Sequence, residues 1–319
     1  MIKKNSNNFP CIQVSNLRKE YGRRKTALDG ISFKVDYGKV FGFLGPNGAG
    51  KSTTIKILTT LLNPSSGNVL IFDKDITSQA SEIRKKIGVV SQQPSSENNL
   101  TVERALDLYG LLWGIKGGRR HDKVNEIIDS FDLQEIRKTK NDELSIGQRR
   151  RVQVAREFMH DMDLLFLDEP TVGLDPSARR ILLDYIKRQV KSGLTVFFTT
   201  HIMEEAEYLC DELAIINRGK IIAFDTPDGL KHRYSENNII DLKVKDITAE
   251  SILPRINNIA HGSKIEINGI NGFKIKSSNS QHILTKIMED FSKNNVKIDS
   301  ITIESASLED VFLNMVNDK

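Results

Sequence analysis

Short apolar runs alternate with longer segments of helical periodicity along the first two thirds of this chain. Four of these runs are continuous rather than alternating: Val40–Leu44, Ile87–Val90, Leu164–Leu167 and Thr195–Thr199. Strands that helices cover on both faces have this character, because neither face meets water. Strands that alternate with helices form parallel sheets, so we expect an α/β fold with a central parallel sheet.

A mostly helical block separates the second run from the third and spans about residues 94–160. Its apolar side chains recur at the three- and four-residue spacing of an amphipathic helix, at Val102, Ala105, Leu106, Tyr109, Leu112 and Trp113. We expect this block to form a helical subdomain inserted into the sheet.

The pattern changes after the turn-forming segment Asp225–Gly229. Just before it, Leu213–Ile216 and Lys220–Phe224 predict a hairpin that closes the first domain. Clusters of Pro, Gly and Asp mark turns between structural elements. We therefore expect one domain over residues 1–229 and a second over residues 230–319.

The second domain follows a different order of elements. We expect a strand, a helix, two strands, a helix and a strand, at Ile239–Val244, Ala249–Ile259, within Lys264–Lys276, Gln281–Asn294 and Val296–Ile303. This β-α-β-β-α-β order is that of ferredoxin-like domains. A short helix from Leu308 to Val316 ends the chain. The sequence thus predicts an α+β, ferredoxin-like second domain.

Charge and composition exclude several classes of protein. The chain has 46 Lys and Arg against 42 Asp and Glu, a net charge of only +4. A nucleic-acid-binding protein needs a concentrated basic face with interleaved aromatic residues, which the runs Arg149–Arg151 and Arg84–Lys86 lack. We interpret both runs as solvated helix faces and expect no nucleic-acid partner.

Other features argue against secretion of this chain and against disulfides or a structural metal site. Two cysteines, Cys11 and Cys210, are too few for a disulfide framework, so we expect buried, reduced thiols. The six histidines are scattered, which disfavours a structural transition-metal site. No apolar stretch reaches the roughly 18 residues of a membrane span, and the first residues lack the apolar core of a signal peptide. We expect a cytoplasmic protein.

A glycine-rich loop lies between the first apolar run and a helical pattern. It reads Gly45-Pro46-Asn47-Gly48-Ala49-Gly50-Lys51-Ser52-Thr53, the phosphate-binding G-x-x-x-x-G-K-[ST] pattern in its strand–loop–helix setting. Such a loop directs backbone N–H groups at phosphates from the positive end of a helix. Lys51 reaches the β- and γ-phosphates in this arrangement, and the Ser52 hydroxyl holds Mg²⁺.

Two carboxylates end the apolar run Leu164–Leu167. We expect Asp168 to serve the Mg²⁺ ion and Glu169 to act as a base near the attacking water. The pattern is weak by itself, because many strands end in surface acids. After a phosphate-binding loop it indicates an ATPase.

Three further segments narrow the family. Leu144–Gln148 precedes a helix, Gly173-Leu174-Asp175 follows the two carboxylates, and His201 follows the run Thr195–Thr199. With the phosphate-binding loop, the order of these motifs resembles the ATP-binding subunits of ABC transporters over about residues 12–229. The resemblance makes the first domain an ABC ATP-binding domain that hydrolyses ATP with Mg²⁺.

The resemblance also implies roles for single residues around the nucleotide. Tyr21 corresponds to the aromatic residue that stacks on adenine. Gln92 corresponds to the glutamine that contacts Mg²⁺ or the attacking water, with Gln93 a less favoured candidate. His201 corresponds to the switch histidine that holds the γ-phosphate.

Other positions correspond to residues that act between two subunits. Ser145, Gly147 and Gln148 match the signature segment, which binds in trans to the nucleotide of a second subunit. Asp175 matches the residue that links the two sites. Ile146 departs from the family pattern, which usually has glycine there, and this change affects how the backbone packs over the nucleotide.

The resemblance can be narrowed to one branch. Met203–Glu207, Leu209–Asp211 and Ser307–Phe312 look like the daunorubicin-resistance branch, whose members pair with ABC-2 type membrane permeases. This implies multidrug export, a second ATP-binding subunit (a homodimer is expected) and a position on the inner face of the cell membrane. That branch carries a similar C-terminal extension, and we expect the second domain to be a regulatory element.

One alternative stays open, a soluble ABC ATPase that acts on nucleic acid, the ribosome or an assembly scaffold. Such proteins usually carry two ATP-binding modules or a long coiled-coil insertion, and this sequence has neither. An ATPase of an assembly scaffold lacks an exporter-like second domain, so the second domain expected here argues against that interpretation.

Overall fold

The structure, a computed structural model, describes residues 9–22, 25–92, 99–234, 238–277, 279–304 and 307–317. Gln93 lies outside the described residues. The chain divides into two compact units, Met1–Thr226 and Pro227–Lys319. We describe each unit by itself.

A six-stranded sheet runs through the first unit in the order β10-β9-β3-β8-β7-β6. Its strands are β3 (Val40–Leu44), β6 (Ile87–Val90), β7 (Leu164–Asp168), β8 (Thr195–Thr199), β9 (Glu212–Asn217) and β10 (Lys220–Asp225). All neighbours are parallel except β9 and β10, which form the expected antiparallel hairpin. Every residue of β3, β7 and β8 is buried. The prediction of a covered parallel sheet is confirmed.

A second, antiparallel sheet is a feature that the sequence analysis misses. It has the order β2-β1-β4-β5 and comprises β1 (Ile12–Tyr21), β2 (Lys25–Val35), β4 (Ser66–Ile71) and β5 (Lys74–Asp75). Val14 lies opposite Phe33 on one side and Val69 on the other. Irregular register along β1 interrupts the alternation of apolar and polar residues, so the period-two signal of a strand is weak.

Stacked aromatic rings join the two sheets. Phe33 of β2 stacks on Phe41 of β3 with ring centroids 5.2 Å apart. Phe197 of β8 lies 5.5 Å from Phe41, and Phe166 of β7 lies 5.7 Å from Phe197. Fully buried aromatic rings contribute several kcal/mol in total through burial and ring contacts, on the order of 2 kcal/mol each. This cluster therefore fixes the strands whose ends carry the chemistry-bearing residues.

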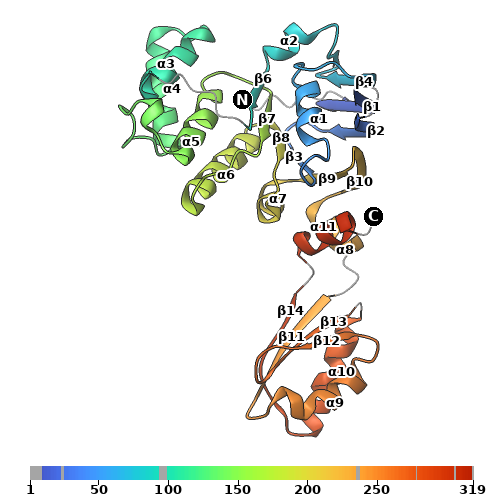
Figure 1. Ribbon diagram of the computed structural model, residues 1–319. Helices are drawn as coiled ribbons and strands as arrows, with labels where there is room; N and C mark the ends of the chain where they lie inside the picture. The colour runs from blue at the N-terminus through green and yellow to red at the C-terminus, as the bar shows by residue number, and fades with distance from the viewer. Residues whose placement is uncertain are drawn as a thin grey trace. The chain divides into compact units, whose positions relative to one another are not determined.

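Helices cover the first unit, and three of them gather at one end of it (Figure 1). These three, α3 (Val102–Leu112), α4 (Gly117–Ser130) and α5 (Ile146–Glu157), lie in the block where the sequence predicts helices. The others in this unit are α1 (Lys51–Leu58), α2 (Ala80–Arg84), α6 (Pro176–Lys191) and α7 (Met203–Leu209), with a 3₁₀ turn at Asn141–Glu143. Thr101 caps α3, because its hydroxyl accepts a hydrogen bond from the Arg104 N–H.

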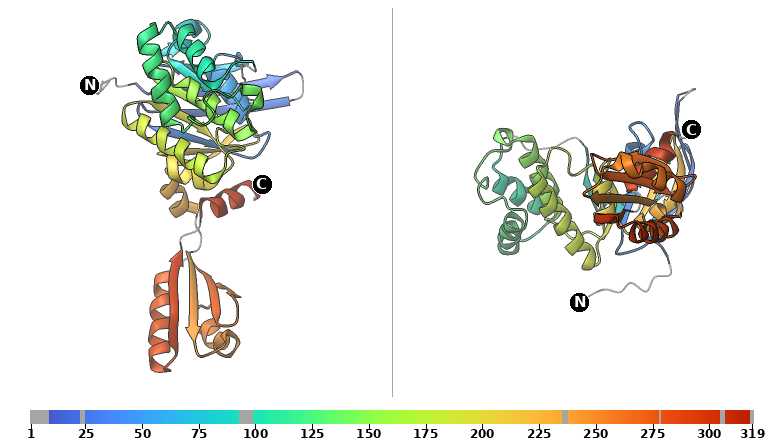
Figure 2. Two further views of the ribbon diagram at one scale, coloured as in Figure 1. Left: turned by 90° about the vertical axis from the view of Figure 1, so that its left-hand side faces the viewer. Right: turned by 90° about the horizontal axis from the view of Figure 1, so that it is seen from below.

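The second unit contains a four-stranded antiparallel sheet in the order β12-β13-β11-β14. Its elements are β11 (Asn238–Lys245), α9 (Ala249–Ile259), β12 (Lys264–Ile267), β13 (Gly272–Ser277), α10 (Ser280–Lys293) and β14 (Lys297–Glu304). Helices α9 and α10 cover one face of the sheet (Figures 1 and 2). Ile240, Leu242 and Val244 point into this core at alternate positions of β11, as a sheet with one solvated face requires.

A helix begins where the sequence analysis expects a turn. Helix α8 (Pro227–Tyr234) starts within the segment Asp225–Gly229. Proline favours the first turn of a helix, because its fixed φ is already helical and its missing N–H has no partner there. Helix α8 packs against the last helix, α11 (Leu308–Asn317) (Figure 1). The domain boundary expected after residue 229 stays a prediction, and it lies inside this helix.

Both cysteines are buried and free. Burial raises the pKa of the Cys11 thiol to about 12 and that of Cys210 well above its usual value, so neither is a reactive thiolate. The prediction of buried, reduced thiols is confirmed. None of the described helices has the length and apolar character that a membrane crossing needs.

The core of the second unit can be tested on one helix. Phe291 of α10 is 1% exposed and belongs to the apolar cluster, whereas Met288 on the same helix is 49% exposed. We expect Phe291→Ala to lower the free energy of unfolding by about 3–5 kcal/mol, because it leaves a cavity. Met288→Ala should cost less than about 1 kcal/mol. Differential scanning calorimetry checks both, and equal losses would contradict the described core.

Candidate active site

The glycine-rich segment leaves β3 and turns directly into α1. A Cβ atom on Gly45 would lie 2.3 Å from the carbonyl oxygen of Ile216, and one on Gly50 would lie 2.8 Å from that of Ala27. Gly50 also has a φ of 118°, where side chains are rarely accepted. These two positions therefore require glycine, and the loop exposes backbone N–H groups at a helix N-terminus, which favours anions.

Lys51 places its ammonium group inside the loop. The Lys51 Nζ donates hydrogen bonds to the carbonyl oxygens of Gly45 (2.6 Å) and Pro46 (3.3 Å). Burial lowers the pKa of Lys51, while the carboxylates of Asp168 and Glu169 act in the opposite direction. The loop thus holds a cation opposite two carboxylates, where a nucleotide phosphate can bind.

A cavity opens beside this loop and is lined by residues that the sequence predicts: Tyr21, Asn47, Gly48, Gly50, Lys51, Ser52, Thr53, Gln92 and Glu169. Lys25, Thr26 and Ala27 also line it. The Tyr21 ring is 42% exposed at the end of β1. An exposed aromatic ring can stack on a base, because every base has a π face.

The remaining residues of the loop stabilise it through backbone hydrogen bonds. Gly45, Pro46 and Ala49 are not among the residues that line the cavity. The Ala49 N–H donates a hydrogen bond to the Pro46 carbonyl at 3.1 Å. The Gly219 N–H donates to the Ala49 carbonyl at 2.9 Å, so the hairpin of β9 and β10 supports the loop.

The two carboxylates at the end of β7 have different partners. Asp168 accepts a hydrogen bond from Thr199 Oγ1 at 2.7 Å. Glu169 has a φ of 48°, a left-handed conformation that is costly for a residue other than glycine, by about 1–3 kcal/mol. Its N–H donates to the carbonyl oxygen of Thr199 at 3.1 Å. These bonds hold the strained turn and leave the Glu169 side chain in the cavity wall.

Gln92 and His201 both approach the Glu169 carboxylate, each from one of the two strands that flank β7. Gln92 follows β6, His201 follows β8, and β7 lies between these strands. The Gln92 Nε2 lies 3.4 Å from Glu169 Oε2, and the His201 Nδ1 lies 3.5 Å from Glu169 Oε1. The parallel register thus brings three predicted residues together, and a carboxylate held in this way can position a water and accept its proton.

The oxygen donors near the loop suit Mg²⁺ bound with a nucleotide. Ser52 offers a hydroxyl, Gln92 an amide oxygen and Asp168 a carboxylate. Mg²⁺ binds to such ligands in small number and takes the rest from water and phosphate. Within the described ranges, no three or more His, Cys, Asp or Glu side chains group as a metal site.

The signature segment lies at the start of α5 and does not line the cavity. Ser145 caps the helix: its Oγ accepts from the Gln148 N–H at 3.2 Å, and Gln148 Oε1 accepts from the Ser145 N–H at 3.0 Å. A Cβ on Gly147 would lie 2.6 Å from the carbonyl oxygen of Gly173, so this position requires glycine. The reciprocal cap fixes the free end of the helix.

Ile146 does not disturb this helix start. It is the first residue of α5 and its side chain is 74% exposed. Its Cγ2 lies 3.1 Å from the position of a Cβ on Gly173.

Asp175 caps α6 by accepting a hydrogen bond from the Ala178 N–H at 2.9 Å, and this bond lowers the pKa of Asp175.

Arg150 contradicts the sequence analysis, which places it on a solvated face. Its side chain is 2% exposed. The guanidinium donates to carbonyl oxygens at the ends of β6 and β7, those of Ser91 (2.5 Å), Asp168 (2.6 Å), Glu169 (2.7 Å) and Pro170 (3.1 Å), and to Gln153 Oε1 (2.7 Å). Burial lowers the pKa of Arg150 to about 10, and the carboxylates of Asp168 and Glu169 oppose this shift.

A helical signal could have identified this residue. Arg150 precedes Gln153 and Val154 by three and four positions, and all three are buried. Residues at this spacing share one helix face. The neighbouring Arg149 and Arg151 are only partly buried, whereas Arg84–Lys86 is exposed as expected. The structure thus adds a positioning residue that ties α5 to two strand ends.

Comparison with known proteins agrees with this geometry. The profile of the "ABC transporter" family matches residues 28–172. The chain is 35% identical to the linearmycin resistance ATP-binding protein LnrL of Bacillus subtilis, over 95% of this chain and 97% of that protein. It is 34% identical to the daunorubicin/doxorubicin resistance ATP-binding protein DrrA of Streptomyces peucetius, over 95% of this chain and 91% of that protein.

The chain belongs to the ABC transporter family. It is an ATP-binding subunit and an ATPase, and its similarity to LnrL and DrrA confirms the daunorubicin-resistance branch. Subunits of this family act in pairs and with membrane permeases.

Solved structures agree with the fold of this ABC subunit. An ATP-binding subunit of an ABC transporter has a TM-score of 0.65 at 28% identity, over 70% of this chain and 93% of that one. The dimeric ABC transporter cassette MJ0796 has a TM-score of 0.63 at 25% identity, over 67% of this chain and 98% of that one. The ABC ATPase fold of the first unit is confirmed.

The role of Arg150 in this ABC subunit can be tested by truncation. We expect Arg150→Ala to lower the free energy of unfolding by about 3 kcal/mol, because buried carbonyls that lose a donor cost about 1–3 kcal/mol each and water offsets part of this. Arg84→Ala, at an exposed position, should change it by less than about 0.5 kcal/mol. Thermal unfolding of the two variants checks the prediction, and matching stabilities would show that Arg150 does not hold α5 to the two strand ends.

Proposed function

We propose that this chain is the ATP-hydrolysing subunit of a drug exporter and powers a separate ABC-2 type membrane permease. The observation that carries the proposal is the cavity in which Lys51 lies opposite Glu169, with Gln92 and His201 on the Glu169 carboxylate. The names of LnrL and DrrA, both resistance ATP-binding proteins, support the export of toxic small molecules.

Catalysis in this proposal consists of positioning and charge neutralisation. The loop N–H groups and Lys51 hold the β- and γ-phosphates, and Tyr21 stacks on the adenine. Glu169 orients the attacking water and accepts its proton, while His201 holds the γ-phosphate. Mg²⁺, held by Ser52, Gln92 and Asp168, would neutralise phosphate charge.

A second copy of the chain completes the site. Ser145, Gly147 and Gln148 do not line the cavity of their own chain, and they stand at a capped helix N-terminus that suits a phosphate. We assign them to the γ-phosphate bound by the partner subunit, with Asp175 linking the two sites. Each predicted site position carries a residue of the required kind, which favours a homodimer.

The second unit has a regulatory role in this proposal. Its strand order and its helices on one face support a ferredoxin-like fold. It contains none of the residues assigned to ATP or Mg²⁺. We propose that it adjusts pairing of the subunits or their coupling to the permease, on the cytoplasmic face of the membrane.

The role of Lys51 is tested against a lysine on the same helix. We expect Lys51→Ala to abolish ATP hydrolysis and to weaken nucleotide binding strongly, because the phosphates lose their fixed cation. Lys56→Ala, at an exposed position of α1, should keep both. Steady-state turnover and nucleotide titration measure the two variants. Undiminished turnover in the Lys51 variant would contradict the assignment of Lys51 to the nucleotide phosphates.

Glu169→Gln separates binding from hydrolysis. We expect this variant to bind ATP but to hydrolyse it about 10²–10⁴ times more slowly, because the base is lost while the phosphate ligands remain. ATP should then accumulate in a closed pair of subunits. Gel filtration with ATP and Mg²⁺ should show a stable dimer that the unmodified chain forms only transiently. A monomer at high protein concentration would count against the shared site.

A further inference from the structure

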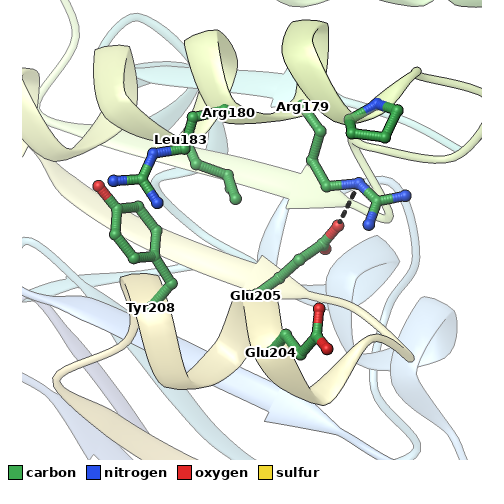
Figure 3. Close-up of a pocket in the computed structure, with 7 residues that line it drawn as sticks. Arg179, Arg180, Leu183, Glu204, Glu205 and Tyr208 are labelled. Carbon is green, nitrogen blue, oxygen red and sulfur yellow. Dashed lines mark ion pairs between the residues drawn. The ribbon is translucent and has the colours of Figure 1, made fainter.

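A buried carboxylate lies outside the nucleotide cavity and joins three segments of the first unit. Glu205 of α7 is 2% exposed. Its Oε2 accepts hydrogen bonds from Thr171 Oγ1 (2.9 Å) and Thr200 Oγ1 (2.7 Å). Its Oε1 forms an ion pair with Arg179 Nε of α6 at 3.3 Å (Figure 3). A buried carboxylate is stable only with such partners, so its position and theirs are mutually fixed.

The first partner holds the residue before the switch histidine. Thr200 immediately precedes His201, and its Oγ1 also accepts from the Ile202 N–H at 3.0 Å. The Thr200 hydroxyl thereby donates one hydrogen bond and accepts another, which fixes its position. The His201 side chain itself is more than half exposed and contacts Glu169 at 3.5 Å. Its placement over a phosphate therefore depends on the backbone that Thr200 anchors.

The other two partners lead to the residue that links the paired sites. Thr171 lies two residues after Glu169, and its carbonyl accepts from the Leu174 N–H at 3.0 Å. The Arg179 N–H donates to the carbonyl of Asp175 at 2.9 Å. The segment from Glu169 to Asp175 is thus attached to Glu205 near both of its ends.

The hollow between α6 and α7 that Glu205 borders does not itself need a ligand. Arg180, which lines it, forms an ion pair with Asp184 at 3.1 Å. Its guanidinium also lies 4.1 Å from the ring centroid of Tyr208 (Figure 3). The Tyr208 hydroxyl donates a hydrogen bond to Asp184. The cations on this surface already have partners, so the carboxylate beneath is the feature to explain.

We propose that Glu205 is a positioning residue for ATP hydrolysis. It acts through Thr200 on His201 and through Thr171 and Arg179 on the segment that ends at Asp175, and it touches neither nucleotide nor metal. This inference rests on the proposed function of the cavity. It assigns a role in hydrolysis to a carboxylate that the sequence analysis names only as part of the segment Met203–Glu207, without a role of its own.

Glu205→Gln tests the carboxylate while keeping its size. The neutral amide cannot form the ion pair with Arg179, and its NH₂ group is a donor where the carboxylate accepts hydrogen bonds from two hydroxyls. We expect kcat for ATP to fall between about 10-fold and 100-fold, since a misplacement of about 1 Å costs this much. KM and nucleotide affinity should stay within about twofold, because the loss concerns the transition state. Glu204→Gln, one residue earlier and exposed, is the matched control and should keep kcat.

A second background distinguishes positioning from general stability. If Glu205 acts through His201, Glu205→Gln should reduce kcat little further in a His201→Ala chain, because residues that act as a unit are not additive. A full additional loss would overturn the positioning role, as would unchanged kcat in Glu205→Gln alone. If His201→Ala alone leaves kcat unchanged, the proposed function fails and this inference falls with it.

Substitutions at Thr200 keep the proposal testable if Glu205→Gln does not fold, which circular dichroism would show. Thr200→Val removes the hydroxyl and should lower kcat about 10-fold without a matching rise in KM. Thr200→Ser restores the hydroxyl and should recover most of kcat. Equal turnover in the Val and Ser variants would overturn the proposal.

Discussion

The parallel hydrogen-bonded register of β3, β8 and β7 is the constraint on which the rest of the first unit depends. Parallel strands end at the same edge of a sheet, so the residues that follow them become neighbours although they are far apart in sequence. Gly42 lies opposite Phe198, and Asp168 opposite Thr199. The phosphate-binding loop, the two carboxylates and His201 therefore meet at one edge, and the aromatic cluster behind them keeps the strands in place.

Two buried charges of opposite sign attach helices to these strand ends. Arg150 of α5 binds carbonyl oxygens at the ends of β6 and β7, and Glu205 of α7 binds hydroxyls after β7 and β8. Isolated buried charges are unfavourable, so each of these two attachments is stable only while the strand ends keep their positions. Arg150 and Glu205 both hold the segment after β7. This explains how Glu169 can keep a left-handed backbone conformation at the cavity.

The sequence predicts the parallel strands and the phosphate-binding loop because continuous apolar runs and glycine spacing are local signals. The antiparallel sheet is missed because the irregular register of β1 hides its alternation. Arg150 is missed because the charge of three consecutive arginines predicts a solvated face, although the spacing of Arg150 to Val154 places it on the buried face. Glu205 gives no such signal: its partners come from three separate segments, and only the tertiary fold brings them to one carboxylate.

An exposed apolar residue connects the single chain with the proposed pair. Ile146 stands at the free end of α5 with 74% of its surface exposed, beside the close contact of Gly147 with Gly173. Exposing an isoleucine costs free energy that burial in a partner interface would recover, at roughly 25 cal/mol per Å² of apolar surface. The start of a helix does not require glycine at this position, since its backbone is already helical. If the proposed homodimer buries Ile146 against the partner, the departure at this position would favour closure of the pair, while Ser145 and Gly147 keep the polar groups and the space that a phosphate needs.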